Sequence, residues 1–316
     1  MKLVFMGTPE FSLACLERLI DAGHEVCAVF TQPDKPKNRG KKIQMTPVKE
    51  CALAHDIPVY QPNSLRRGEE AEQMLALLKQ LAPECIIVVA YGQILPKQVL
   101  EIPKYGCINV HASLLPRYRG AAPIQRCIQF GEKKTGVTTM YMAEGLDTGD
   151  MILTAEAEIT PDMTGAMLHD ILAAQGAELI TETLRQVEAG TAPRIPQTEC
   201  PDEYAKYARM ITKDELLLDF TKPAAQLRAF VMAMSDSPCA YTYFAGKRLK
   251  IFSAELGGST SAQAGTVTNP DDFSVACGDG VELKFTEVQP EGGKRMSIAD
   301  FLRGRKPEKG EKLSQQ

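Results

Sequence analysis

The chain has 316 residues, 44% of them hydrophobic, and a formal net charge of −4, so it can bury a sizeable core and is long enough for two domains. The net negative charge excludes a uniformly basic nucleic-acid coat protein but not a local basic patch. The longest apolar run, Ile86 to Tyr91, is far shorter than the ~20 residues that a membrane-spanning helix needs. The sequence therefore predicts a protein that does not interact with a membrane.

The nine cysteines are scattered along the chain and form no C-x-x-C pair. This distribution argues against a disulfide framework and against a zinc site, and it is typical of reduced thiols. We therefore expect a cytoplasmic protein that needs no metal.

The first 30 residues predict a β-α-β unit. Strands are expected at Lys2–Met6 and Glu25–Phe30, and the helix between them, at about Pro9–Ala22, has apolar residues at helical spacing and ends at Gly23. The two strands should be parallel. The first turn contains Gly7 but lacks the other glycines of the G-x-G-x-x-G pattern, which argues against a dinucleotide site.

A polar segment, residues 31–46, follows the second strand, and its prolines and glycine predict a loop without regular structure. Its basic residues outnumber its single acidic residue, Asp34, and they are Lys35, Lys37, Arg39, Lys41 and Lys42. An ordinary solvated loop is one interpretation. The other is a mobile basic arm for a polyanionic substrate, because ligands of α/β domains bind at the carboxyl ends of the strands.

Two helices and a buried strand are expected next. Thr46 as N-cap and Pro47 at the first helical position predict a helix that runs to about His55, and a second helix is expected at Glu69–Leu81. The apolar run Glu84–Ala90 predicts a central strand that is buried on both faces. The loop directly after this strand is expected to form a pocket wall with Tyr91, Gly92 and Gln93.

The run Cys107–His111 predicts a strand that places Asn109 and His111 on one face, because side chains alternate along a strand. An amide can donate a hydrogen bond to a developing oxyanion, and an imidazole can move protons near neutral pH. This pair suits group transfer at a carbonyl carbon, although both side chains could merely satisfy their own hydrogen bonds. An apolar wall follows the pair, formed by Ser113, Leu114, Leu115 and Pro116.

The remainder of the first domain predicts a helix at about Pro123–Phe130, strands at Gly136–Met142 and Met151–Ile159, and a long helix at Thr164–Ala189. The sequence between the two strands is G-L-D-T-G-D. Its Asp147 is by default a turn residue.

A proline-rich linker, residues 190–203, is predicted to separate a first domain, 1–189, from a second domain, 204–316. The second domain predicts one helix and five short strands, spaced as in a small closed barrel, at Pro223–Met234, Ala240–Phe244, Arg248–Glu255, Gly265–Thr268, Phe273–Ala276 and Val281–Val288. Five strands suggest an OB-like fold, which is a common platform for nucleic acids. The charged tail beyond Pro307 is expected to fray.

Two linked motifs resemble the signature of folate-dependent formyltransferases. They are N-x-H-x-S-L-L-P and, further along, G-L-D-T-G-D. The catalytic set of that family is an Asn, a His and the Asp of the second motif, which match Asn109, His111 and Asp147 here. The resemblance thus implies that Asn109 donates to the oxyanion, that His111 stabilises it and carries protons, and that Asp147 orients His111 and raises its basicity or handles protons through water.

A wider resemblance, to the methionyl-tRNA formyltransferase family, covers nearly the whole chain through G-T-P-E-F, P-D-K-P-K-N-R-G-K-K, V-V-A-Y-G-Q-I-L-P and R-G-A-A-P-I-Q. It implies an α/β, Rossmann-like formyltransferase domain with a parallel-rich sheet, followed by a smaller OB-like β-barrel domain. It also implies transfer of a formyl group from 10-formyltetrahydrofolate to the amino group of methionyl initiator tRNA, without a metal.

The same resemblance implies roles for two segments. The segment from Ser113 to Pro116 would line the folate site, and the basic arm, Pro33 to Lys42, would enter the acceptor end of the tRNA. One departure lies in the second domain, where Ser235–Tyr241 reads S-D-S-P-C-A-Y instead of N-P-W-P-G-A-Y and lacks the Trp. That loss weakens the expectation for tRNA contacts there, not for the chemistry. We expect a monomer.

Other functions stay open from the sequence alone. Related formyltransferases act on a sugar-nucleotide amine or on a purine precursor, and a related hydrolase releases formate from 10-formyltetrahydrofolate. A Ser113-His111-Asp147 hydrolase would use the same residue types, but the chain has no G-x-S-x-G motif. An RNA-binding module with a decayed pocket is a further alternative, which the complete catalytic set argues against.

Overall fold

The computed structural model describes residues 1–37 and 42–313 and divides into two compact units. Unit 1 consists of Met1–Gly120, Lys134–Glu158 and His169–Tyr207, and unit 2 consists of Ala121–Lys133, Ile159–Leu168 and Ala208–Gln316. Unit 2 therefore takes two segments from inside the range 1–189 that the sequence assigns to the first domain. The predicted domain boundaries at 190 and 204 stay a prediction.

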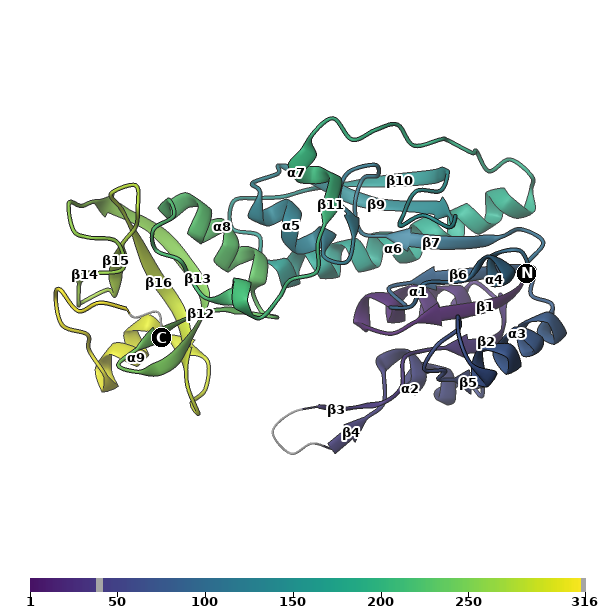
Figure 1. The fold of residues 1–316 in the computed structure, drawn as a ribbon, viewed down its shortest axis with the longest axis horizontal. Coiled ribbons are helices and arrows are strands. Elements are labelled where there is room, and N and C mark those ends of the chain that lie inside the picture. The colour runs from purple at the N-terminus through teal and green to yellow at the C-terminus, as the bar shows by residue number, and fades with distance from the viewer. Residues whose placement is uncertain (38–41, 314–316) are drawn as a thin grey trace. The chain divides into compact units, whose positions relative to one another are not determined.

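Unit 1 is built on a seven-stranded sheet in the order β10-β9-β7-β6-β1-β2-β5 (Figure 1). Its strands are β1 (Lys2–Gly7), β2 (Glu25–Phe30), β5 (Val59–Tyr60), β6 (Cys85–Val89), β7 (Cys107–His111), β9 (Lys134–Tyr141) and β10 (Met151–Glu158). The strands from β7 to β5 pair in parallel, whereas β9 and β10 pair antiparallel at one edge. The predicted Rossmann-like domain with a parallel-rich sheet is confirmed.

Helices accompany this sheet. They are α1 (Glu10–Asp21), α2 (Pro47–Ala54), α3 (Glu69–Leu81), α4 (Lys97–Leu100), α6 (Gly165–Glu188), whose first turn belongs to unit 2, and the short α7 (Glu203–Lys206). In α6, a Cβ added to Gly176 would lie 3.1 Å from the Val110 side chain and 3.8 Å from Cys15 in α1. Val110 therefore points toward these helices, and because side chains alternate along a strand, Asn109 and His111 point to the opposite face of the sheet.

The segment expected to be an irregular loop instead forms a two-stranded antiparallel hairpin, which corrects the sequence prediction. Strand β3 (Lys35–Lys37) pairs with β4 (Lys42–Gln44), and Pro36 lies opposite Ile43. A proline is tolerated in such a ribbon because each strand has an open edge, where no ladder hydrogen bond is required from it. The predicted arm is thus an ordered structure at least as far as the Lys37–Lys42 pair.

Tertiary contacts at the base of the hairpin explain why propensity alone failed. The hydroxyls of Thr31 and Thr46 lie 2.9 Å apart, and Lys49 Nζ donates to Asp34 Oδ2 at 2.5 Å and to Gln61 Oε1 at 2.7 Å. Burial disfavours ionisation of Asp34, but the hydrogen bonds from Lys49 and Gln61 outweigh this effect and hold the pKa of the carboxyl below its ordinary value.

Unit 2 contains an antiparallel sheet in the order β12-β13-β16-β15-β14, with β17 paired to β16. The strands are β12 (Ala240–Phe244), β13 (Lys247–Ser259), β14 (Val267–Asn269), β15 (Ser274–Ala276), β16 (Val281–Pro290) and β17 (Met296–Ser297). The helices are α5 (Pro123–Gln129), the 3-10 helix η1 (Asp214–Leu216), α8 (Ala224–Met234) and α9 (Ile298–Gly304). Two short strands, β8 (Arg119–Gly120) and β11 (Tyr207–Ala208), lie near the ends of unit 1 segments. The predicted α/β domain followed by a smaller β domain is confirmed.

Two features at the C-terminus differ from the sequence analysis. Helix α9 was not predicted, although Ser297 caps it by accepting a hydrogen bond from the Asp300 amide and Phe301 packs into the core. The segment beyond Pro307 does not fray at residues 310–313. The Gly310 amide donates to the Val267 carbonyl in β14, the Leu313 amide donates to the Gly265 carbonyl just before it, and the Leu313 side chain is buried. One apolar side chain thus fixes an otherwise charged tail.

Three further observations bear on the expectations from composition. All nine cysteines are free thiols, and none of the helices in residues 1–37 and 42–313 combines the length and apolar character that crossing a membrane requires. Within the same residues, His, Cys, Asp and Glu side chains form no group of three or more that could hold a metal ion.

The cluster at the base of the hairpin predicts a pH-dependent contribution to stability. Lys49→Met should lower the free energy of unfolding by about 1–3 kcal/mol at pH 7, because Asp34 is left half-buried without its cation. Since the folded-state pKa of Asp34 is depressed, this contribution is present above about pH 4 and disappears as the pH falls through the folded value. Urea unfolding across pH 3–7 measures it, with Lys97→Met as the control, since the Lys97–Glu101 pair is exposed and should contribute less than about 1 kcal/mol. Equal stability of both variants would contradict the role of the cluster.

Candidate active site

The candidate site lies where β7 ends in unit 1. Strand β7 pairs in parallel with β6 and antiparallel with β9. Asn109 and His111 are both on the face away from α6 and are both buried, with exposed fractions of 9% and 6%. The sheet therefore brings together the amide and the imidazole that the sequence singled out.

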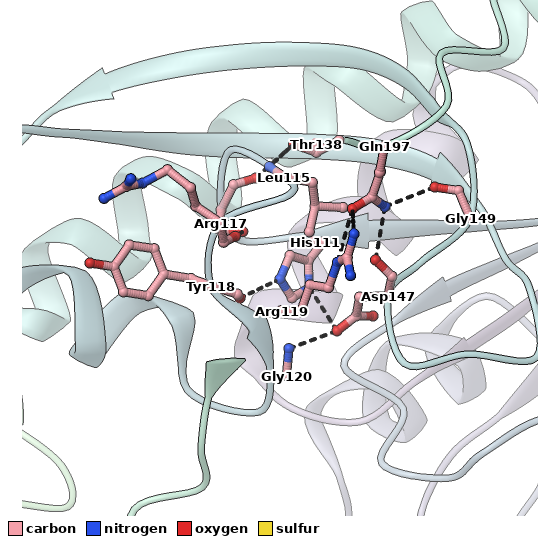
Figure 2. Close-up of polar contacts among 11 residues, drawn as sticks. His111, Leu115, Arg117, Tyr118, Arg119, Gly120, Thr138, Asp147, Gly149 and Gln197 are labelled. Atoms are coloured by element: carbon pink, nitrogen blue, oxygen red, sulfur yellow. Dashed lines mark hydrogen bonds and ion pairs between the residues drawn. The ribbon is translucent and has the colours of Figure 1, made fainter. Parts of the chain in front are cut away.

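The His111 ring is held from both sides (Figure 2). Its Nε2 lies 2.9 Å from the backbone oxygen of Tyr118, and its Nδ1 lies 3.7 Å from Asp147 Oδ2. A carbonyl oxygen only accepts hydrogen bonds, so Nε2 must carry the hydrogen. Nδ1 is therefore the nitrogen that can accept a proton, and a ring protonated on both nitrogens forms an ion pair with Asp147.

Asp147 reaches His111 because its loop folds back. Strand β9 is antiparallel to β7 and ends beside Ile108, near the start of β7, so the loop after β9 must return along the sheet to reach the other end. Asp147 has a φ of 50°, a left-handed conformation that is uncommon outside glycine and is best tolerated by Asp and Asn. Its Oδ2 accepts a hydrogen bond of 2.8 Å from the Gly120 amide, which fixes the carboxylate in front of the imidazole.

The side-chain amide of Asn109 makes no hydrogen bond to any other residue in the described part of the chain. Such an amide, at the end of a buried strand and two residues before His111, is suited to bind a polar atom of a substrate. The neighbouring thiol of Cys107 is no competing nucleophile, because burial raises its pKa to about 12.

The segment expected to line the folate site is fixed mainly by backbone contacts. Ser113 is fully buried and its hydroxyl donates to the Arg117 carbonyl at 2.6 Å. Thr138 on β9 donates to the Ser113 carbonyl at 2.7 Å and accepts from the Leu115 amide at 3.2 Å. Leu115 is buried as well, whereas Leu114 and Pro116 are partly exposed, so these last two offer the accessible apolar surface of the segment.

The loop after β6 differs from a simple pocket wall. The Tyr91 side chain is buried in the core beside Leu95 and Val99, its hydroxyl has no partner within the described residues, and burial raises its pKa. Gln93 donates to the Pro62 carbonyl and accepts from the Leu65 amide. The Tyr91 carbonyl accepts from Thr8 and Gln32, whereas Gly92 is exposed, so Gly92 rather than the two larger side chains is the part of this loop that a ligand can reach.

The basic arm is only partly within the described structure. Arg39 and Lys41 lie outside the described residues. Lys35 begins β3 and is exposed, and Lys37 and Lys42 are paired opposite each other at the far end of the ladder. The hairpin therefore brings Lys37 and Lys42 next to each other, at the end of the ladder away from the base.

Gln197 is the residue that the sequence analysis missed. Its Nε2 donates to the backbone oxygens of Asp147 and Gly149, both at 2.8 Å, and its Oε1 accepts from Arg119 Nε and Nη2 at 3.0 and 2.7 Å (Figure 2). A single glutamine in a proline-rich linker has no pattern of spacing or composition that would single it out.

Comparison with known proteins identifies the family. The model of the family described as formyl transferase matches residues 1–184, and that of the formyl transferase C-terminal domain matches residues 210–306. A methionyl-tRNA formyltransferase from Agathobacter rectalis is 48% identical over 98% of both chains, and one from Magnetococcus marinus is 50% identical over 99% of this chain and 98% of its own. The chain belongs to the methionyl-tRNA formyltransferase family. It is a formyltransferase, as the two motifs predicted.

Solved structures agree on the fold. A sugar 3N-formyl transferase, whose structure was determined in the presence of dTDP and 5-N-formyl-THF, aligns with a TM-score of 0.63 at 16% identity over 90% of this chain and 97% of its own. HypX from Aquifex aeolicus, in complex with tetrahydrofolic acid, aligns with a TM-score of 0.64 at 17% identity over 96% of this chain and 47% of its own. At these identities the likeness concerns the fold alone.

Proposed function

We propose that this formyltransferase moves a formyl group from 10-formyltetrahydrofolate to the amino group of methionyl initiator tRNA. The observation that carries the proposal is the His111 ring, held between Asp147 and the Tyr118 carbonyl. Asn109 lies two residues before it, and its amide has no hydrogen-bond partner among the described residues. The names of the full-length relatives support the tRNA substrate. The reaction forms one C–N bond and breaks another, so it needs no oxidant.

Asn109 is the proposed oxyanion donor. The methionyl amine attacks the formyl carbon as a free base and gives a tetrahedral intermediate with a negative oxygen. A neutral amide fixed at a strand end stabilises this charge without reorganising. The burial of Asn109 strengthens the effect, because few water molecules compete for the same oxygen.

His111 and Asp147 are proposed to move the proton that the attacking amine loses. Nδ1 accepts it, directly or through water, since Nε2 already carries a hydrogen. The resulting imidazolium lies 3.7 Å from the Asp147 carboxylate, which stabilises its charge. The same proton can then be returned to the nitrogen of the departing tetrahydrofolate, so that proton number balances over the cycle.

The folate is proposed to lie against Leu114, Pro116 and the backbone at Gly92. The two apolar side chains are partly exposed within an otherwise buried segment, and Gly92 is exposed. Such a surface suits the flat aminobenzoyl ring of a folate, while the pterin, which is rich in hydrogen-bonding groups, needs polar partners that fix its orientation. Ser113, Tyr91 and Gln93, in contrast, support this surface from below through buried or internally bonded side chains.

Two surfaces are proposed to bind the tRNA. One is the arm, with Lys35, Lys37, Arg39, Lys41 and Lys42. The other is the outer face of β12 and β13 in unit 2, where Tyr241 lies opposite Lys250 and Tyr243 opposite Arg248. The Arg248 guanidinium lies 3.9 Å from the Tyr241 ring centre. Basic and aromatic side chains that alternate with buried ones suit an RNA backbone and its bases.

The rival hydrolase interpretation lacks its geometry. A Ser-His-Asp triad requires the serine hydroxyl to donate to the histidine nitrogen that faces away from the Asp. Here Ser113 donates to the Arg117 carbonyl instead, and His111 Nε2 is engaged by the Tyr118 carbonyl. A sugar-nucleotide amine as substrate would use the same catalytic set, so the substrate class is tested through the arm below.

The first test is the reaction itself. The protein, incubated with 10-formyltetrahydrofolate and methionyl initiator tRNA, should produce formylmethionyl-tRNA, and Asn109→Ala should lower kcat by about 100- to 1000-fold because one oxyanion donor is lost. Circular dichroism checks that the variant is folded. A folded Asn109→Ala protein with near-normal kcat would remove Asn109 from the mechanism.

The second test concerns the charge of Asp147. Asp147→Asn preserves the shape of the side chain but removes its charge, so it should lower kcat. The reason is that the carboxylate faces the imidazole and stabilises the positive charge that the ring carries while it holds the proton. The rate of formyl transfer by the folded variant decides this point, and full activity would leave Asp147 as a turn residue.

The third test separates tRNA from small amine substrates. Replacing Arg39, Lys41 and Lys42 together with Ala should lower kcat/KM for initiator tRNA and flatten its dependence on salt concentration, because each phosphate contact releases condensed counterions. The KM for 10-formyltetrahydrofolate should hardly change. A control triple variant on exposed lysines of unit 1 away from the arm, Lys79, Lys97 and Lys104, should behave as the parent. Superimposable salt plots for parent and arm variant would rule out tRNA binding by the arm.

A further inference from the structure

The segment expected to be a free linker is bound to unit 1 at several points. The Ile195 amide and carbonyl pair with those of Met151, each at 2.9 Å. Farther along, Asp202 forms an ion pair with Arg117, and the Ala205 carbonyl accepts from the Tyr118 amide. Residues 195–205 thus pass along the backbone that presents Tyr118 to His111, and we call them the strap.

Gln197, within the strap, uses the whole hydrogen-bonding capacity of its amide. Both N–H groups donate to backbone carbonyls, those of Asp147 and Gly149, in the loop of residues 143–149, which we call the catalytic loop. The amide oxygen accepts twice from Arg119. Arg119 precedes Gly120, whose amide holds the Asp147 carboxylate. Gln197 is therefore connected to Asp147 along two routes, one through the backbone of the loop and one through the strand that holds its carboxylate.

The catalytic loop has little packing of its own. Residues 143–146 and Thr148 are exposed, including the Leu146 side chain. Gly149 is packed against the end of β9, since a Cβ there would lie 1.8 Å from the Tyr141 carbonyl, whereas the close contact of Gly145 is to Thr148 of the same loop. The left-handed conformation of Asp147 must consequently be maintained by hydrogen bonds, because a non-glycine residue keeps such a conformation only where its surroundings enforce it.

We propose that Gln197 is a positioning residue for formyl transfer, which fixes the Asp147 loop so that its carboxylate faces His111 Nδ1. The proposal rests on the proposed function of Asp147. Gln197 touches neither reacting group and acts through the two loop carbonyls. The distance between the Asp147 carboxylate and the His111 imidazole depends on the conformation of this loop. Because a shift of about 1 Å in a catalytic group can lower the rate about 100-fold, loss of the Gln197 contacts should slow the reaction.

Two substitutions of Gln197 separate its contacts. Gln197→Glu keeps an acceptor for Arg119, but its ionised carboxylate cannot donate and repels the carbonyls of Asp147 and Gly149. Gln197→Met has a similar volume and loses both sets of contacts. The control is Gln175→Glu on α6, which also removes a donor to a backbone carbonyl in unit 1, that of Glu156, far from the loop in sequence.

The kinetic experiment measures kcat and the KM for initiator tRNA. Both Gln197 variants should lower kcat by about 10- to 100-fold with little change in that KM, whereas Gln175→Glu should resemble the parent. Unchanged kcat in a folded Gln197→Met protein would overturn the proposal. So would a loss confined to Gln197→Met, because it would assign the effect to Arg119 instead of the loop.

A second readout does not depend on turnover. The chain has four histidines, so the ring signals of His111 can be followed by NMR in the full-length protein. Gln197→Glu and Gln197→Met should move these signals in the same direction as Asp147→Asn, while Gln175→Glu should not. Unmoved His111 signals would overturn the proposal even if stability falls, since a merely structural role predicts that result. If the parent fails to formylate tRNA, this readout still tests the loop on its own.

Discussion

The hydrogen bond from His111 Nε2 to the Tyr118 carbonyl is the interaction on which the site depends. The carbonyl can only accept, so this single contact of 2.9 Å selects the tautomer and turns Nδ1 toward Asp147. A catalytic histidine needs one nitrogen engaged for orientation and the other free for chemistry. The backbone of residues 117–120 supplies the first requirement at Tyr118 and, through the Gly120 amide, also holds the carboxylate that supports the second.

This constraint explains the unusual course of the chain around the sheet. Strand β9 is antiparallel to β7, so it ends near the start of β7, whereas His111 lies at the end of β7. The loop that carries Asp147 must therefore fold back along the sheet to reach His111. A returning loop that is mostly exposed has few apolar contacts to fix it. Its conformation is set instead by the tight packing of Gly149 and by the strap, in which Gln197 holds two of its carbonyls. The strap thus has the composition of a linker but forms part of the structure that holds the site.

Sequence patterns predicted those parts of the molecule that depend on local chemistry. The β-branched run of β6, the N-cap at Thr46 and the alternation of Asn109 and His111 each have a periodicity or a cap that can be recognised in isolation. The hairpin of the arm and the strap could not be predicted in this way. Lys and Gln have weak preferences, and the prolines of the arm argue against a strand. The contacts among Asp34, Lys49 and Gln61, which are distant in sequence, fix the base of the hairpin instead. Helix α9, in contrast, has a local signal in the sequence, because Ser297 is an N-cap residue and Asp300 lies three positions after it.

The most direct test of the central claim is the tautomeric state of His111, measured by nitrogen NMR of the full-length protein labelled at histidine. A signal lost in a His111→Asn variant identifies the ring. We expect the neutral ring to carry its hydrogen on Nε2, which donates to the Tyr118 carbonyl, with Nδ1 bare on the side of Asp147. A neutral ring protonated on Nδ1, with Nε2 bare, would contradict it, because such a ring could neither donate to the Tyr118 carbonyl nor accept a proton at the side that faces Asp147.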